Sequence, residues 1–333
     1  MLIHLFHPLF FFSLLLGVFM SISSPTWLAA WVGLELNLLS FIPIITIKKN
    51  TFSSEAALKY FLIQALGSAT IIASASLMLS TPMNTNLIIE SALLLKMGAA
   101  PFHFWFPQVM EGLDWASAIM LMTIQKIAPL VLISYTLTNF MNQKFLMMFA
   151  IISSLVGAFG GINQTMLRKI LAFSSINHMS WMLLSMSLSE LYWSYYFIFY
   201  SIISSSIGIL FLFQQSFHIS HLSSISFSPL MKILAIMSLL SLGGLPPFIG
   251  FLPKWLIIQQ LSINLQFFPL TIMLFAALIT LYYYIRITIS SLTMHSLKSS
   301  WIPLKSVQMK IFLPTLLTFN LSSLLIIPSL LFF

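Results

Sequence analysis

Four lone charged residues stand inside long apolar stretches of this chain, namely Glu35, Lys96, Lys126 and Lys254. Three of them fall near the middle of a segment that is long enough to cross a membrane. A charge at the centre of a bilayer costs at least about 2.5–3.5 kcal/mol, so such residues are rare and usually mark an ion or proton path. The pattern therefore favours a membrane protein that moves protons.

The composition places the whole chain in a membrane. Of its 333 residues 59% are hydrophobic and 6% are charged, and the mean hydropathy is +1.02. A soluble domain carries about 25% charged residues. The apolar runs continue throughout, so residues 1–333 are predicted to form a single membrane domain. Cysteine is absent, which excludes disulfides, iron–sulfur ligation by thiolates and a thiolate nucleophile.

The segment lengths predict an all-α integral membrane protein with eleven transmembrane helices. Helices are expected because an unpaired backbone is costly in lipid and the segments are longer than barrel strands. The first run lacks a basic start and a small-residue cleavage site, so it is expected to be a retained span. The predicted spans cover about residues 3–22, 25–46, 56–79, 87–106, 116–138, 145–163, 169–189, 191–215, 230–260, 266–288 and 311–331.

The basic residues predict the orientation. The net charge is +8, but the positive residues gather at segment ends and not on a nucleic-acid-binding face. Lys144 is the only one on the side opposite the N-terminus, whereas nine lie in loops on the N-terminal side: Lys48, Lys49, Arg168, Lys169, Lys232, Arg286, Lys298, Lys305 and Lys310. This bias predicts that the N-terminus faces the matrix or cytoplasm and that Phe333 lies on the other side.

Two predicted spans carry the same interruption. Gly98, Pro101, Phe102 and Pro107 recur as Gly244, Pro247, Phe248 and Pro253, each at an offset of 146 residues. Proline removes a helix hydrogen bond, so each site is expected to break its helix. The four intact spans between them predict inverted repeats, residues 1–138 and 145–288, with 311–331 as an extra helix. Chance matching in a biased composition is the alternative.

Glu35 and Lys96 are the first candidates for proton chemistry. Glu35 has no neutralising neighbour in its own segment, and Lys96 immediately precedes the first break. Opposite charges stabilise each other, while burial favours the neutral forms. A Glu35–Lys96 pair can therefore act as a switch, in which the separated lysine releases its proton. The alternative is a static buried pair that only fixes helix packing, although such pairs are often no better than apolar residues.

Two more lysines and two histidines complete the candidate path. Lys126 is about ten residues, or roughly 15 Å, from either end of its segment, beyond the reach of snorkelling. Lys254 follows the second break, where it either belongs to the path or anchors the helix at an interface. His178, which suits proton hopping, and His103 are weaker candidates, since a lone histidine is often a hydrogen-bonded core residue. No metal site, paired haem ligands or phosphate loop is predicted.

These segments resemble the antiporter-like subunits of mitochondrial respiratory complex I over nearly the whole chain. The resemblance is carried by residues 33–41, 95–105, 125–129, 244–248 and 253–255. It implies a proton pathway that uses Glu35, Lys96, Lys126 and Lys254, and it adds weight to His178. Bacterial relatives have fourteen helices, and eleven resembles the animal form.

The resemblance also implies a setting. The chain would belong to a proton-translocating NADH:ubiquinone reductase of the mitochondrial inner membrane, beside neighbouring antiporter-like subunits, accessory subunits and lipids. NAD, FMN, iron–sulfur clusters and ubiquinone would act in other subunits, so no cofactor is expected here. Two alternatives remain: a sodium–proton antiporter subunit on the same fold, and a scaffold whose buried charges serve assembly. The short chain and mitochondrial-like composition disfavour the first, and four isolated charges in spans disfavour the second.

Overall fold

The computed structural model describes residues 2–46, 50–80, 85–137, 139–224 and 229–293. Regular structure in these residues is helical, and strand pairing among them is limited to one antiparallel bridge between Met166 and His218. The prediction of an all-helical fold is confirmed for this part of the chain. The chain divides into two compact units, residues 1–153 and 154–333, and their boundary falls inside helix α8 (Phe140–Gly161).

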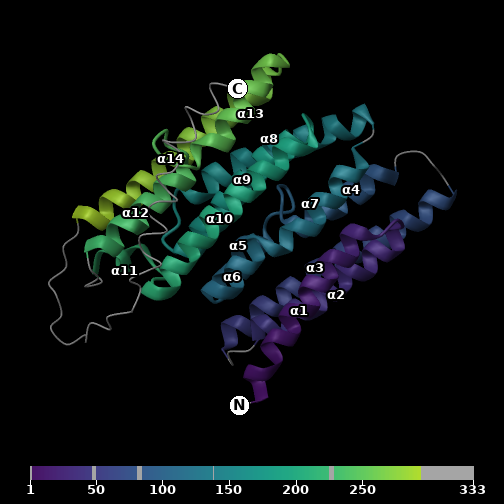
Figure 1. Ribbon diagram of the computed structural model, residues 1–333, viewed down its shortest axis with the longest axis horizontal. Helices are drawn as coiled ribbons and strands as arrows, with labels where there is room; N and C mark the ends of the chain where they lie inside the picture. The colour runs from purple at the N-terminus through teal and green to yellow at the C-terminus, as the bar shows by residue number, and fades with distance from the viewer. Residues whose placement is uncertain (1, 47–49, 81–84, 138, 225–228, 294–333) are drawn as a thin grey trace. The chain divides into compact units, whose positions relative to one another are not determined.

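Unit 1 contains seven helices before α8 within its described residues (Figure 1). Helix α1 packs on α2, α2 packs on α3, and α4 contacts both α3 and α7. The seven helices are α1 (Leu2–Ser23), α2 (Trp27–Thr46), α3 (Thr51–Ser80), α4 (Thr85–Met97), α5 (Trp105–Gly112), α6 (Trp115–Met122) and α7 (Ile124–Thr136).

Helices α1 and α2 approach closely at two glycines. A Cβ atom on Gly33 would lie 2.6 Å from the backbone nitrogen of Ser21 and 2.8 Å from the carbonyl oxygen of Gly17. Small residues allow this approach, and close packing is the main attraction between helices in lipid, where no hydrophobic effect drives them together. Gly17 and Gly33 therefore fix the pairing of the first two helices.

Unit 2 is built around α9, whose residues are almost all buried. Helices α10, α13 and α14 contact α9. Its serines are satisfied within the helix: Ser174 donates to Leu171 O at 2.9 Å and Ser175 to Ala172 O at 2.7 Å. The helices of this unit after α8 are α9 (Leu167–Met186), α10 (Glu190–Gln214), α11 (Ile219–Ser224), α12 (Pro229–Gly243), α13 (Phe251–Ile263) and α14 (Phe267–Thr293).

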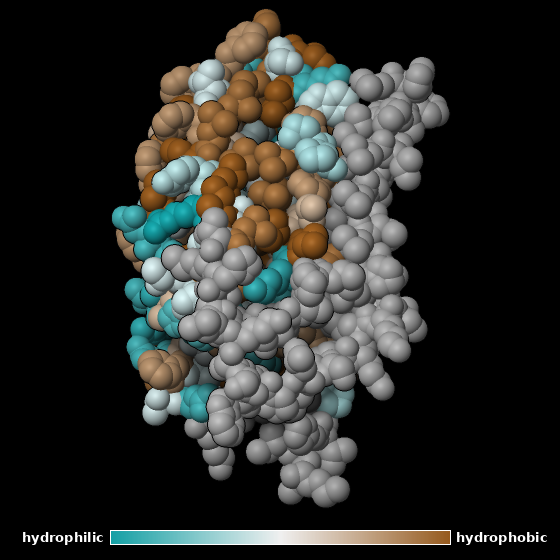
Figure 2. All heavy atoms as spheres, turned by 90° about the vertical axis from the view of Figure 1, so that its left-hand side faces the viewer, coloured by the Kyte–Doolittle hydropathy of each residue, from teal (hydrophilic) through white to brown (hydrophobic). Residues whose placement is uncertain are grey.

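The surface is that of a membrane protein. Figure 2 shows hydrophobic side chains gathered over much of the described part of one face. Large apolar side chains are exposed along single helices, such as Phe275 and Leu278 on α14. Six helical segments of the described chain are long and apolar enough to cross a membrane: Trp27–Thr46, Thr51–Met78, Trp115–Thr136, Phe140–Gly161, Glu190–Gln214 and Phe267–Leu292. The predicted span 311–331 lies outside the described residues.

Helical structure stops at both sites of the repeated motif. Helix α4 ends at Met97 and α5 begins at Trp105, while α12 ends at Gly243 and α13 begins at Phe251. The two ends and the two starts are separated by the same 146 residues as the sequence motifs. Gly98 and Gly244 follow the helix ends with φ of +74° and +82°. Only glycine adopts this left-handed backbone without a Cβ penalty, which explains its place in both motifs.

A further interruption was not predicted. The sequence indicated one helix over residues 116–138, but α6 ends at Met122 and α7 begins at Ile124. Thr123 separates them, and its hydroxyl donates to the carbonyl oxygen of Ile119 at 2.7 Å. Such a bond to a carbonyl four residues earlier often bends a helix. The restart of the helix at Ile124 places Lys126 in the first turn of α7.

Candidate functional site

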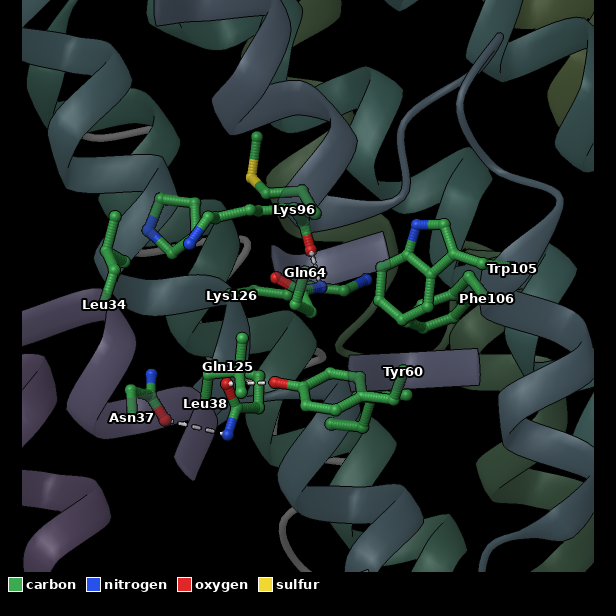
Figure 3. Close-up of a pocket in the computed structure, with 13 residues that line it drawn as sticks. Leu34, Asn37, Leu38, Tyr60, Gln64, Lys96, Trp105, Phe106, Gln125 and Lys126 are labelled. Carbon is green, nitrogen blue, oxygen red and sulfur yellow. Dashed lines mark hydrogen bonds between the residues drawn. The ribbon is translucent and has the colours of Figure 1, made fainter. Parts of the chain in front are cut away.

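Unit 1 encloses a small cavity into which the two central lysines of that unit project (Figure 3). Its volume is about 20 Å³, which is room for one water molecule. The wall is apolar on several sides, with Leu34, Leu38 and Phe106 among its residues. The polar side chains in its lining come from five helices: Asn37 of α2, Tyr60 and Gln64 of α3, Lys96 of α4, Trp105 of α5, and Gln125 and Lys126 of α7.

Lys96 enters the cavity from the last turn of α4, and its side chain is 6% exposed. The helix ends one residue later, so its final carbonyls need partners outside the helix. Gln64 Nε2 donates to Lys96 O at 3.0 Å, and Trp105 Nε1 donates to Leu95 O at 3.1 Å. Gly67 of α3 leaves space for the lysine, because a Cβ there would lie 3.0 Å from Lys96 Cγ.

Lys126 enters the same cavity from α7 and is 2% exposed. Its Nζ lies 4.9 Å from the centroid of the Phe106 ring, a distance at which a cation is attracted to the ring face. Phe106 belongs to α5, which begins after the first break. The break therefore supplies the aromatic wall that faces the second lysine.

A network of amide and phenol groups closes the cavity. Tyr60 donates from its hydroxyl to Gln125 Oε1 at 3.2 Å, and Gln125 Nε2 donates to Asn37 Oδ1 at 2.9 Å (Figure 3). These bonds connect α2, α3 and α7 immediately beside Lys126. This network was not predicted from the sequence, because its contacts depend on the rotation of three helices. The polar residues in otherwise apolar segments were the available signal.

Glu35 faces a different space from the two lysines. It is half-buried and lines an open hollow of about 400 Å³ together with Leu9, Phe10 and Ser13 of α1. Opposite charges on Glu35 and Lys96 favour each other's charged form. An exposed ion pair elsewhere in the unit joins Lys59 to Glu55 at 2.6 Å. Glu35 and Lys96 thus attract each other without forming a contact pair in this structure.

Lys254 and His178 lie in unit 2 and have different polar partners. Lys254, in the first turn of α13, is 5% exposed and donates from Nζ to the carbonyl oxygen of Gly243 at 2.9 Å. His178, near the middle of α9, is hydrogen-bonded through Nδ1 to the hydroxyl of Tyr196 at 2.8 Å. The ring of Tyr200 is also close, at 5.1 Å between centroids. Both candidates are buried polar groups inside their unit.

His103 lies within the first break, between α4 and α5. Its Nδ1 is 3.2 Å from the carbonyl oxygen of Pro101, and its ring stacks near Phe104 at 4.3 Å. These contacts hold the ring against the turn itself, and His103 is not among the residues that line the lysine cavity. Within the described part of the chain, no group of three or more His, Asp and Glu side chains is arranged to hold a metal ion.

The cavity has the elements of a proton-transfer site. Two buried lysine side chains line one small polar space that has room for a water molecule, and water can carry protons between amines. The surrounding amides and the phenol can orient that water, because each keeps donor or acceptor capacity. The apolar walls exclude bulk solvent. Buried lysines exchange their proton more readily than arginines do, because a guanidinium stays protonated.

An all-helical membrane protein with buried lysines at helix breaks belongs to the class of ion-translocating membrane proteins. A family model described as "NADH:quinone oxidoreductase/Mrp antiporter, TM" matches residues 24–280, and the chain belongs to this family. Among similar proteins, the NADH-ubiquinone oxidoreductase chain 2 of Anopheles gambiae is 50% identical over 304 residues, which covers 88% of each chain. The protein of the same name from Aedes aegypti is 48% identical and covers 90% of this chain and 89% of its own.

A solved structure shows the same fold. A chain of the respiratory complex I from Thermus thermophilus superimposes with a TM-score of 0.76 at 24% sequence identity. The match covers 86% of this chain and 70% of that one. At this identity the likeness concerns the fold. It agrees with the antiporter-like membrane fold that the sequence predicted.

Proposed function

We propose that this chain is a membrane-arm subunit of respiratory complex I that moves protons across the mitochondrial inner membrane. The curated relatives from two mosquitoes, both named NADH-ubiquinone oxidoreductase chain 2, support membership of that complex. NADH oxidation and ubiquinone reduction belong to other subunits, with their NAD, FMN and iron–sulfur clusters. This chain has no cysteine with which to ligate such clusters.

The observation that carries the proposal is the shared cavity of Lys96 and Lys126. Both side chains are buried, and both line a space sized for water. A buried amine at membrane depth is costly as an ion, and a purely structural role would be served as well by apolar residues. Proton exchange between the two amines through water explains why lysines occupy these positions despite the free-energy cost of burying them.

The remaining candidates extend this path. Glu35 attracts the proton on Lys96 when the two approach, and it releases Lys96 when they separate. Lys126 passes the proton onward, and His178 and Lys254 continue the path in unit 2. His103 is the least supported member, because its ring is engaged at the turn. This sequence of steps rests on the burial and partners of each group.

The two interrupted regions support a repeat architecture. In this proposal α4 with α5 and α12 with α13 are discontinuous membrane spans, and residues 1–138 and 145–288 are inverted repeats. The identical 146-residue separation of both helix ends and both helix starts supports this equivalence. Broken helices of this kind border ion paths because they supply backbone groups and space at membrane depth. Eleven spans then follow from the sequence pattern.

The position in the membrane follows from the charged loops. The N-terminus faces the matrix and the C-terminus faces the intermembrane space, because nine loop cations lie on the N-terminal side and one on the other. The apolar outer surfaces of the helices contact lipid, neighbouring antiporter-like subunits and accessory subunits.

The test is the substitution Lys96→Met in the assembled complex, reconstituted into sealed vesicles. Methionine keeps much of the side-chain volume but cannot carry a proton. The expected result is a strong loss of protons moved per NADH oxidised and slower coupled turnover, with the complex still assembled. Lys59→Met, which changes an exposed lysine, is the matched control. Normal turnover with a normal proton yield in the assembled Lys96→Met complex would refute the proposal.

A sodium–proton antiporter subunit is the second candidate, because the matching family model covers Mrp antiporters as well. The two functions differ in their ion. Replacing sodium by choline on both sides of the vesicles leaves proton movement unchanged for a complex I subunit. An antiporter loses it. If the chain is only a scaffold subunit, Lys96→Met should leave the proton yield unchanged.

A further inference from the structure

Unit 1 contains a second buried acid, Glu90, which the sequence analysis did not weigh. Its side chain is 0% exposed and lies in α4, six residues before Lys96. Six helical residues correspond to about 9 Å along the axis and about 120° around it. Half of the hydrocarbon core is about 15 Å thick. With Lys96 near the midplane, Glu90 is therefore also at membrane depth, on a different face of the same helix.

The surroundings of Glu90 come from the junction of α7 and α8. The side chains of Thr136, the last residue of α7, and Asn142, in the first turn of α8, lie next to its carboxyl group without forming a hydrogen bond to it in this structure. Both are already engaged with the backbone. Asn142 Nδ2 donates to Thr136 O at 2.8 Å, and Thr136 Oγ1 donates to Ile133 O at 2.8 Å.

Neither carboxyl oxygen of Glu90 has a partner at hydrogen-bonding distance and geometry among the described residues. A carboxyl group that only held helices together would be expected to have one, because buried polar groups without partners are costly. The packing of α4 on α7 therefore does not explain why a carboxyl group occupies this position.

The two neighbours match both protonation states of a carboxyl group. The hydroxyl proton of Thr136 is used on Ile133 O, so its oxygen is an acceptor for a protonated Glu90. Asn142 uses one amide proton on Thr136 O, and its second amide proton can be donated to the ionised carboxylate. A group that takes up and releases protons in place needs a partner in each state. This site offers both.

Its position gives the site a direction. Lys126 and Thr136 are ten residues apart on α7, which is about 15 Å, and Glu90 is beside the Thr136 end. The loop from α7 to α8 leads to Lys144, which is exposed. Glu90 therefore stands between the lysine cavity and the surface at which α7 ends.

We propose that Glu90 is a proton-carrying residue that connects the cavity of Lys96 and Lys126 to the surface at the α7–α8 junction. A lysine ammonium gives its proton to water, several water molecules in turn relay a proton over the roughly 9 Å to the Glu90 carboxylate, and the resulting acid releases it to water at the junction. The lysine is left as the neutral amine. With the orientation argued above, this path leads to the intermembrane space. The inference rests on the proposed function and adds a route inside unit 1.

The test is Glu90→Gln in the assembled complex in sealed vesicles. Glutamine has the same shape and can still accept from Asn142 and donate to Thr136, but it cannot carry a proton. The expected result is a loss of proton yield per NADH oxidised comparable to that of Lys96→Met, with normal assembly. Glu90→Asp should retain part of the yield. Glu55→Gln, at an exposed acid paired with Lys59, is the control. Full yield in Glu90→Gln overturns the inference.

Thr136→Val decides the matter if the glutamine variant does not assemble, because valine keeps the shape and removes the acceptor oxygen. A reduced proton yield supports the path, and an unchanged yield overturns it. The Lys96→Met variant separates this result from the proposed function. A low proton yield in Lys96→Met with a normal yield in the Glu90 and Thr136 variants refutes only the proposed role of Glu90. A normal proton yield in Lys96→Met refutes the proposed function itself.

Discussion

The side-chain ammonium of Lys254 is hydrogen-bonded at 2.9 Å to the carbonyl oxygen of Gly243, the last residue of α12. A cation at the carboxyl end of a helix is stabilised by the unpaired carbonyls there. At the first break, the carbonyl oxygens at the end of α4 are instead hydrogen-bonded by the amide of Gln64 and the indole of Trp105. Lys96 therefore projects into the cavity, whereas Lys254 both closes a helix and is a candidate proton carrier.

Two substitutions of Lys254 should separate these two roles. Lys254→Met removes the donor from Gly243 O, and an unsatisfied buried carbonyl costs about 1–3 kcal/mol. We expect less assembled complex and a lower proton yield. Lys254→Arg keeps a cationic donor that does not release its proton, so assembly should be close to normal while the proton yield falls. Native gels and vesicle acidification measure the two quantities. Equal assembly of both variants would contradict the capping role.

Gln125 should matter through the positions it fixes. Gln125→Leu removes the bonds to Tyr60 and Asn37 and leaves two buried polar side chains without these partners. Each loss is worth about 1–3 kcal/mol, so coupled turnover should fall severalfold while Lys126 remains in place. Tyr60→Phe removes one of the two bonds and should have the smaller effect. Turnover of Gln125→Leu at the control level would show that the network is dispensable.

The hydrogen bond between His178 and Tyr196 gives a prediction in unit 2. Tyr196→Phe removes the hydroxyl from Nδ1 of His178, while the ring still fills its buried site. We expect a partial loss of proton yield and a larger loss in His178→Phe, which removes both exchangeable nitrogens. The loss should be smaller in Tyr196→Phe, because this change removes one hydrogen bond and keeps both ring nitrogens of His178. An unaltered proton yield in both variants would make His178 a packing residue.

The orientation of the chain can be tested with a C-terminal tag. The loop charges predict that Phe333 faces the intermembrane space. Protease added to mitochondria with ruptured outer membranes should remove the tag, and protease confined to the matrix side of inverted vesicles should leave it intact. Cleavage from the matrix side alone would contradict the predicted topology.

The sequence was sufficient to predict features that depend on the residues of a single helix, such as buried charges and helix ends. The expense of a lone charge in an apolar segment selected Lys96 and Lys126, and both are buried at one cavity. Paired Gly and Pro residues marked the points at which α4 and α12 end, because their effect on the backbone is local.

Features that depend on contacts between helices were not accessible in this way. The partners of Gln125 depend on how α2, α3 and α7 are rotated. The end of α6 at Thr123 is marked by neither glycine nor proline. Glu90 did carry a signal, as a lone acid in the same apolar segment as Lys96. The position of Glu35 at the hollow beside α1 likewise depends on how α1 packs against α2, which the sequence does not show.

The polar character of α9 has a consequence for how the chain enters the membrane during synthesis. This helix has 20 residues, but it is absent from the described segments that are apolar enough to cross a membrane unaided. Each polar residue raises the free energy of insertion from the translocon. We expect α9 to wait at the insertion machinery until α10, a strongly apolar segment, follows it. The two would then enter the bilayer together as a hairpin, with the polar face of α9 covered from the outset.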